Sequence, residues 1–267
     1  MKAAVYALLT MPLLAQQDVS LYSVEKERFL GQRLASEVKR QSKPLDHPLV
    51  DAYVKRTGRE LAGHLADSPF VYSFEVILAA NTEPISLPGG IILIPARFFL
   101  TARDEAEFIG MLAHSIGHIA LRHGTRTAMR GQAVNMASIP LVFMGGWMGA
   151  HADGRGTALV PIGFLKFQRT YELEADRFGI ELAARAGYDA AAFRRYIERA
   201  QPPDADSDPR MAPLPARDVR LAGMDELLRS LPVPPPSSSA AEFERIQEAV
   251  REALGRPAQR RAPTLRR

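Results

Sequence analysis

Two pairs of residues spaced four positions apart could together hold a metal ion. The first pair is His114 and His118 in the stretch HSIGH, and the second is Glu172 and Asp176 in the stretch ELEAD. On an α-helix, residues four apart lie on the same face, so each pair can present both side chains to one ion. Two imidazoles and one carboxylate are a common ligand set for zinc, and the other carboxylate can accept the remaining N–H of a ligand histidine. A histidine pair alone also fits two unrelated residues, but unpartnered imidazoles are costly to bury in so apolar a helix.

The composition restricts the kind of metal site and favours a helical fold. The chain has 267 residues and no cysteine, so thiolate ligands and disulfides are excluded and zinc would need histidine and carboxylate ligands. Hydrophobic residues make up 46% and aromatic residues only 7%, which favours a helix-rich fold over a β-sandwich. The net charge is +4, and five of the last twelve residues are arginine with no acid among them. We interpret this tail as a solvated, disordered segment and expect no nucleic-acid partner.

The spacing of apolar residues predicts the elements that must position the two pairs. One helix is expected to begin at Thr101 as N-cap, to carry HSIGH and to end near Gly124. Apolar runs predict neighbouring strands at 70–78 and 91–94, with a turn at Pro88, Gly89 and Gly90 before the second. Further helices are expected at 20–42, 47–66, 164–186 (which carries ELEAD), 190–200, 219–231 and 240–254. The prediction is an α+β fold, mostly α-helical, with a small β-sheet beside the helix of HSIGH.

Three stretches resemble a known family of zinc metallopeptidases. MLAHSIGHIALRHG at 111–124 is similar to the active-site helix of the HtpX-type and BepA-type peptidases, relatives of the CaaX prenyl protease (metallopeptidase family forty-eight, gluzincin-like). That helix reads HExxH, a short apolar stretch and Arg-His. YELEADRFGIELAARAGYD at 171–189 resembles the helix of their third ligand, and ISLPGGIILI at 85–94 resembles the strand at their substrate edge. The resemblance extends from about residue 21 to residue 254.

The resemblance implies a zincin-like fold, one Zn²⁺ per chain and a role for each matching residue. His114, His118 and Glu172 would bind the zinc ion, and Asp176 would orient a ligand histidine. An extended polypeptide would bind along an edge strand that includes Gly89, Gly90, Ile91 and Ile92. His123 is five positions past His118, about 140° round a continuous helix, and is not expected to be a ligand.

The chain departs from the family pattern at three positions. Ser115 stands where the family has the catalytic glutamate of HExxH, and a serine hydroxyl has no useful basicity at neutral pH. Glu83 and Pro84 stand where the family usually has Asn-Ala, and Ala212 stands where BepA-type members have a histidine that can cap the zinc ion. Glu83 is not expected to replace the missing base, because the family geometry places it on the strand and away from the water.

The chain also shows signs of export. Residues 1–15 predict a secretory signal peptide: Lys2 is followed by a mostly apolar run too short to span a bilayer. The expected mature protein is periplasmic or extracellular, with a peptidase domain at 20–231, a Pro/Ser linker at 232–239, a helix at 240–254 and a basic tail at 255–267. The uncharged segment 133–150 is interpreted as a buried or re-entrant helical hairpin, with contact to a membrane surface as the alternative.

Three hypotheses on function follow. The first is an exported zinc metalloendopeptidase acting on polypeptides, with activity impaired by Ser115. The second is an inactive pseudoprotease that keeps the fold and binds peptides or chaperones partners. The third is an interaction protein whose basic tail recruits an acidic partner. Family resemblance favours the first and Ser115 favours the second, because loss of a general base typically costs about 10²- to 10⁴-fold in rate.

Overall fold

The computed structural model describes residues 23–66, 68–132, 162–203, 212, 214–232 and 240–255. The predicted signal peptide at 1–15, the segment at 133–150 and residues 256–267 of the basic tail lie outside the described residues, as does the predicted linker beyond residue 232. None of the helices within the described ranges is long and apolar enough to cross a membrane.

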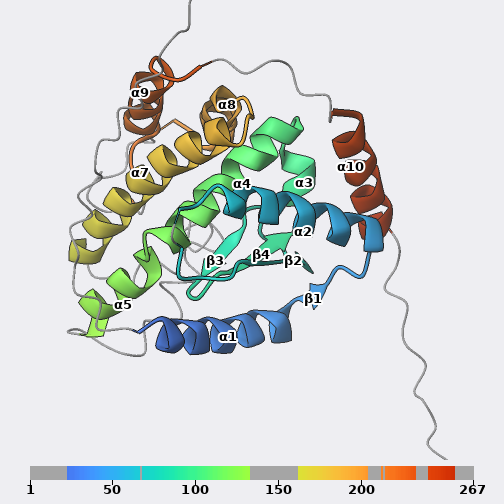
Figure 1. Cartoon of the computed structure of the whole chain (residues 1–267), viewed down its shortest axis with the longest axis horizontal. Helices are drawn as coiled ribbons and strands as arrows, with labels where there is room; N and C mark the ends of the chain where they lie inside the picture. Colours follow the sequence, from blue (N-terminus) through green and yellow to red (C-terminus); the bar gives the residue numbers. More distant parts are fainter. Residues whose placement is uncertain are drawn as a thin grey trace, which may run out of the picture.

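The described chain is mostly helical, with one small mixed sheet, as the sequence predicts (Figure 1). In chain order the elements are α1 (Val24–Gln41), β1 (Lys43–Pro44), α2 (Pro48–Gly63), β2 (Ser73–Leu78), β3 (Ile85–Leu87), β4 (Ile91–Pro95), α3 (Phe98–Thr101), α4 (Glu105–Ala120), α5 (His123–Gln132), α7 (Ile162–Arg185), α8 (Ala191–Ala200), α9 (Arg217–Leu228) and α10 (Ala240–Gly255). The central helix α4 packs against α7, α8 and the sheet.

The sheet has four strands in the order β1-β2-β4-β3. The predicted neighbours β2 and β4 do pair, in parallel, with Ser73 opposite Ile91. Strand β3, which the sequence pattern did not separate from β4, pairs with β4 antiparallel. The prediction that Ile91 and Ile92 lie on an edge strand is therefore wrong, because β4 is hydrogen-bonded on both sides and the edge strand next to it is β3.

Helix α1 covers one face of the sheet, and α2 and α4 cover the other (Figure 1). Side chains of β4 alternate between the two faces: Ile92 and Ile94 join the main core, while Leu93 packs with α1. Helix α1 also packs on the turn between β3 and β4, where a Cβ on Gly89 would lie 2.5 Å from the Cα of Arg28. Gly89 and Gly90 have φ of 78° and 100° and are buried, so this turn is not an open edge for a peptide.

The helix of HSIGH starts and ends differently from the prediction. Thr101 is the last residue of the short helix α3, and the N-cap of α4 is Asp104, whose side chain accepts a hydrogen bond from the backbone N–H of Glu107 at 2.8 Å. At the other end, Arg122 adopts φ 56° and separates α4 from α5, which then runs through Gly124. The helix therefore changes direction two residues before the glycine expected to end it.

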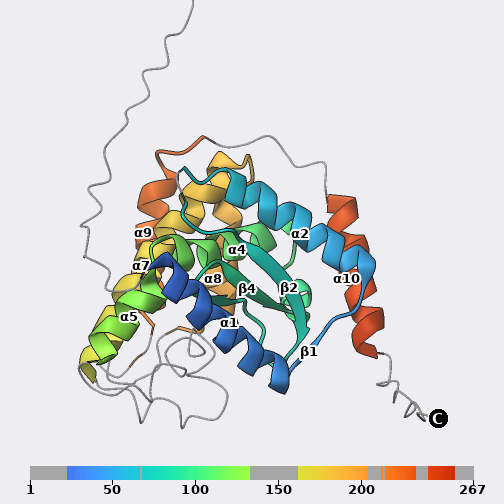
Figure 2. The same ribbon diagram turned by 60° about the horizontal axis from the view of Figure 1, so that its bottom comes forward.

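The C-terminal helix α10 packs in the same domain as α4. Phe243 of α10 is buried against Phe99 and Phe108, with ring centroids 6.5 Å and 5.4 Å away. Gln247 donates from Nε2 to the backbone carbonyls of Phe99 at 2.8 Å and Ala102 at 2.9 Å. Helix α10 lies beside α2, at the end of the domain remote from α5 (Figure 2). This packing holds the start of α4 in place.

Candidate metal centre

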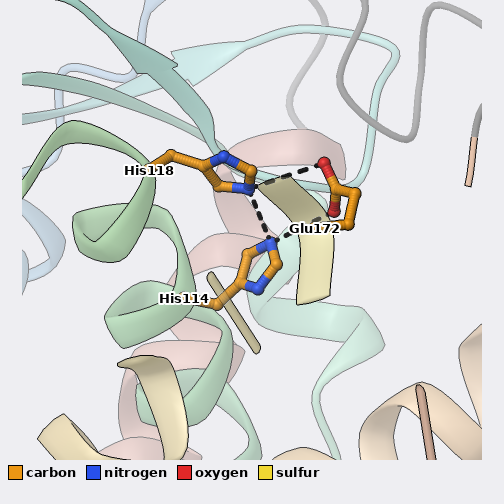
Figure 3. Close-up of side chains that lie close together, drawn as sticks. All are labelled: His114, His118 and Glu172. Atoms are coloured by element: carbon orange, nitrogen blue, oxygen red, sulfur yellow. Dashed lines mark hydrogen bonds and ion pairs between the residues drawn. The ribbon is translucent and has the colours of Figure 1, made fainter. Parts of the chain in front are cut away.

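Helices α4 and α7 bring His114, His118 and Glu172 together (Figure 3). The Nε2 atoms of the two histidines are 3.0 Å apart. Glu172 places Oε2 at 3.5 Å from Nε2 of His114 and Oε1 at 3.6 Å from Nε2 of His118. The side chains of His114 and Glu172 are buried, and that of His118 is 20% exposed. One donor atom from each residue thus faces a common point, and His118 is the most exposed of the three side chains.

A close crossing of α4 and α7 sets the separation of these ligand atoms. Gly179 of α7 lies against the backbone of His114, and Gly117 of α4 lies against Phe178. A Cβ on Gly179 would be 2.8 Å from the backbone nitrogen of His114, closer than real Cβ contacts come. The glycine therefore allows Glu172 to approach the two histidines.

A buried ion pair fixes the orientation of His114. Oδ1 of Asp176 lies 3.0 Å from Nδ1 of His114. Arg220 of α9 donates to both carboxylate oxygens of Asp176, at 2.7 Å and 2.6 Å, and to Oε1 of Gln201 at 3.0 Å. Burial alone would raise the pKa of Asp176, but the charge and hydrogen bonds of Arg220 lower it, so Asp176 stays ionised. The ionised Asp176 thus lies as a charged partner beside Nδ1 of His114, and Nε2 on the other side of the ring faces His118 and Glu172.

A second series of side-chain contacts supports His118. The sequence pattern did not predict these contacts. Nδ1 of His123 lies 3.1 Å from Nδ1 of His118, and Nε2 of His123 lies 3.0 Å from Glu174. Arg126 donates to Glu174 at 2.9 Å, and the ring of Tyr171 stacks on His123 with centroids 4.5 Å apart. On a continuous helix, His123 would point away from His118, so the spacing predicted no contact. The helix instead breaks at Arg122, and this break turns His123 back toward His118. The feature of the sequence that could have indicated this contact is the pair Arg122-His123, which matches the Arg-His pair of the family.

The electrostatics of the three candidate ligands fit a bound cation. Burial disfavours a charged imidazole at both histidines and lowers the pKa of His118 to about 3. At His114 the neighbouring carboxylates of Asp176 and Glu172 outweigh burial and raise the pKa to about 9. Burial would raise the pKa of Glu172, but the nearby histidines and Arg220 lower it. An ionised carboxylate buried against two imidazoles is the donor set that zinc prefers, so these residues fit the ion that the resemblance implies.

Ser115 lies beside this centre, but its side chain is bonded to its own helix. It is buried, and its hydroxyl donates to the backbone carbonyl of Met111 at 2.9 Å. Its own carbonyl accepts a hydrogen bond from the hydroxyl of Ser86 in β3 at 2.9 Å, which fixes the edge strand against α4. Ser115 therefore supplies neither a carboxylate nor a free hydroxyl to the centre.

Glu83 is buried close to the centre, contrary to expectation. It precedes β3 rather than lying on the strand, and its residue is only 5% exposed. Burial raises the pKa of Glu83 to about 8, against the opposing charges of Arg220 and His114 and a hydrogen bond with Tyr196. At the third departing position, Ala212 has no ligand atom in its side chain, and its carbonyl accepts from Nη1 of Arg169 at 2.7 Å.

Comparison with known proteins agrees with this arrangement. The model of peptidase family M48 matches residues 48–251, a range that contains both α4 and α7. The chain belongs to this family. The M48 match includes β2, β3, β4, α4, α7 and most of α10, so the helix after the predicted linker falls within the family fold.

Curated relatives of this M48 chain are identical to it at about a quarter of the aligned positions. A protein of Vibrio cholerae is 25% identical over 207 residues, which cover 71% of this chain and 43% of the relative. The beta-barrel assembly-enhancing protease of Escherichia coli O157:H7 is 25% identical over 198 residues, covering 71% of this chain and 40% of that protein. A protein of the same name from Yersinia pestis is 24% identical over 184 residues. The chain spans about two fifths of the length of these relatives.

Proposed function

We propose that this M48 family member is a zinc-dependent metalloendopeptidase acting on polypeptides. The observation that supports this best is the buried group of His114, His118 and Glu172, in which each histidine has its own partner on the far ring nitrogen. Such paired support is typical of metal-binding histidines, because it fixes both the tautomer and the ring orientation. Two unrelated histidines would not need it.

In this proposal, His114, His118 and Glu172 hold one Zn²⁺. Once bound, zinc would polarise the scissile carbonyl and make a water molecule more acidic. Asp176, locked by Arg220, keeps Nε2 of His114 directed at the ion, and His123 does the same for His118. The low exposure of His114 and Glu172 excludes bulk water and strengthens each electrostatic interaction in the centre.

The proposed substrate is an extended polypeptide bound along β3. Within the described residues, β3 pairs with β4 on one side, and no strand pairs with its other side. The hydrogen bond between Ser86 and Ser115 places this strand next to α4, so a peptide added to it would pass the metal centre. The name of the E. coli and Yersinia relatives, beta-barrel assembly-enhancing protease, supports a polypeptide substrate.

Export is the other part of the proposal. It is supported by the sequence of residues 1–15 and places the protein in the periplasm or outside the cell. Client polypeptides in the cell envelope would then be the substrates, as in protein quality control. Contact of residues 133–150 with a membrane surface stays a prediction of the sequence.

A second candidate is a pseudoprotease that binds polypeptides without cleaving them. The observation that favours it is the Ser115 hydroxyl, which is engaged by Met111 and offers no base at the position where the family has glutamate. In that case the metal centre would have a structural role, and the edge of β3 would serve for binding alone.

Two measurements on the purified protein separate these candidates. The first is the zinc content of wild type and of His114→Ala, for which we expect about one ion and none. The second is casein cleavage by wild type and by Ser115→Glu, with and without a chelator. Chelator-sensitive cleavage by wild type supports the peptidase, and cleavage by Ser115→Glu alone supports the pseudoprotease. A wild-type protein that binds no zinc would contradict both.

A further inference from the structure

Helix α1 carries a buried carboxylate that contacts the break between α4 and α5. Glu27 lies in the first turn of α1, and its residue is only 1% exposed. Its Oε1 accepts hydrogen bonds from Nε of Arg122 at 2.6 Å and from the hydroxyl of Thr125 at 2.8 Å. These partners are 95 and 98 positions away in the sequence. A buried carboxylate is stable only when it is paired, so Glu27 ties α1 to the start of α5.

Helix α1 is itself fixed against the sheet, so Glu27 has a set position. A Cβ on Gly31 would lie 1.9 Å from the carbonyl oxygen of Pro88, and a Cβ on Gly89 would lie 2.5 Å from the Cα of Arg28. Both contacts bring the backbone of α1 directly onto the turn between β3 and β4. Glu27 therefore extends from a rigid support and can constrain the segment that it binds.

That segment has a backbone conformation that its residue does not favour. Among the described residues other than glycine, Arg122 alone has a positive φ, of 56°. Such a conformation persists only where the surrounding structure imposes it. Glu27 binds the side chain of Arg122, and Thr125, its other partner, lies with its hydroxyl 3.1 Å from the carbonyl oxygen of Arg122. These bonds hold both sides of the break in one arrangement.

The break at Arg122 decides where His123 lies. On a continuous helix, His123 would be about 140° round from His118. Because the helix breaks, Nδ1 of His123 lies 3.1 Å from Nδ1 of His118, and its Nε2 lies 3.0 Å from Glu174. When Nε2 of His118 faces the proposed metal ion, the ring proton is on Nδ1, and His123 can accept it. The carboxylate of α1 is thus connected to the ring of a proposed ligand.

We propose that Glu27 is a positioning residue of the metal centre, which holds Arg122 in its left-handed conformation and so keeps His123 against His118. The proposal rests on the zinc site proposed above. Helix α1 precedes residue 48, where the match to the M48 model begins, so the match assigns Glu27 no role. Glu27 acts through Arg122 and His123, and its effect falls on the orientation of His118.

The first test measures zinc affinity by competition with a chromogenic chelator. Glu27→Gln keeps the size of the side chain but removes the charge pair, so zinc affinity should fall by about 10-fold. Adding Arg122→Gly should restore the affinity to within a few-fold of wild type, because glycine adopts the left-handed conformation without support. The matched control is Glu107→Gln, which removes another buried carboxylate bonded to an arginine, Arg199, 92 positions away. It should lower the stability to urea and leave zinc affinity within a few-fold.

The second test is spectroscopic and reports on His118 itself. In the cobalt-substituted protein, the N–H proton of a metal-bound histidine has an NMR signal far outside the normal range. Wild type should show such a signal from His118, protected from exchange with water by His123. In Glu27→Gln this signal should be lost by exchange, while the signal of His114, which faces Asp176, remains. A merely structural role of Glu27 would leave both signals in place.

The outcomes distinguish this inference from the proposed function. Wild-type zinc affinity and an unchanged cobalt spectrum in Glu27→Gln, or an equal loss of affinity in Glu107→Gln, would overturn the role of Glu27 and leave the metal centre intact. If Glu27→Gln does not fold, the milder Thr125→Val removes one bond to Glu27 and should weaken zinc binding by a smaller factor; wild-type affinity in that variant would overturn the inference. A wild-type protein that binds no zinc would overturn the proposed function, and the role of Glu27 with it.

Discussion

Replacing Gly179 by alanine should separate the two helices that carry the proposed ligands. The new Cβ would lie 2.8 Å from the backbone nitrogen of His114, 2.9 Å from its Cα and 3.1 Å from its Cβ. Ordinary van der Waals contact begins at 3.4 Å, so α4 and α7 must move apart by roughly 0.6 Å. Two of the three clashing atoms are backbone, so a change of rotamer cannot relieve the strain. The cost of such overpacking is about 1–3 kcal/mol.

The movement should weaken zinc binding more than it weakens the fold. Ligand distances in a metal site are fixed within about 0.2 Å, and Glu172 would be carried away from the histidines by about three times that distance. We therefore expect zinc affinity to fall by about 10- to 100-fold, which corresponds to about 1.4–2.7 kcal/mol. Competition with a chromogenic chelator measures the affinity, and urea unfolding of the metal-free protein measures the stability.

Two other glycines provide matched controls. Gly223 in α9 has nothing within 4 Å of the place where a Cβ would lie, so its alanine variant should bind zinc normally and gain up to about 1 kcal/mol of stability from helix propensity. Gly117 faces the ring of Phe178 at 3.0 Å, and this side chain can shift. Its alanine variant should have an intermediate effect. Wild-type zinc affinity in Gly179→Ala, or equal effects of the Gly117 and Gly179 variants, would refute the reasoning.

Three further predictions concern the groups around the ligands. Arg220→Met should lower the free energy of unfolding by about 3–5 kcal/mol, because it leaves Asp176 buried without its ion pair; urea unfolding measures this. His123→Phe should weaken zinc binding by about 10- to 100-fold in chelator competition, while the exposed His64→Ala changes nothing. In metal-free protein, Glu83 has a folded pKa of about 8 against about 4.3 unfolded, so its protonated form stabilises the fold below pH 4.3 and the contribution is lost by pH 8. Unfolding from pH 5 to pH 8 should therefore show a steeper loss of stability for wild type than for Glu83→Gln; parallel curves would contradict it.

Much of the centre was predictable because it depends on local spacing. The positions of His114 and His118 on one helix, and of Glu172 and Asp176 on another, follow from the repeat of the α-helix and the apolar pattern around them. The resemblance to M48 peptidases then matched each pair to a role. Helix ends were less predictable, because Thr101 and Asp104 both suit an N-cap, and the choice depends on how α3 packs on the sheet.

The long-range parts of the site depend on tertiary packing. Arg220 is 44 positions from Asp176 in the sequence, and nothing in its local pattern distinguishes it from the other arginines. The place of Ile91 and Ile92 inside the sheet depends on β2 and β3 pairing with opposite sides of β4. The contact of His123 with His118 depends on a single left-handed residue, Arg122.

The sequence by itself determined the two helices that carry the proposed ligands, the family and the absence of glutamate at position 115, since each is expressed in residue types and short spacings. Only the tertiary structure decided which strand forms the edge, what supports each histidine and where a second carboxylate lies. Glu83 shows the physical reason. Its raised pKa depends on desolvation and on charges contributed by three helices, and these come together only when the chain is folded.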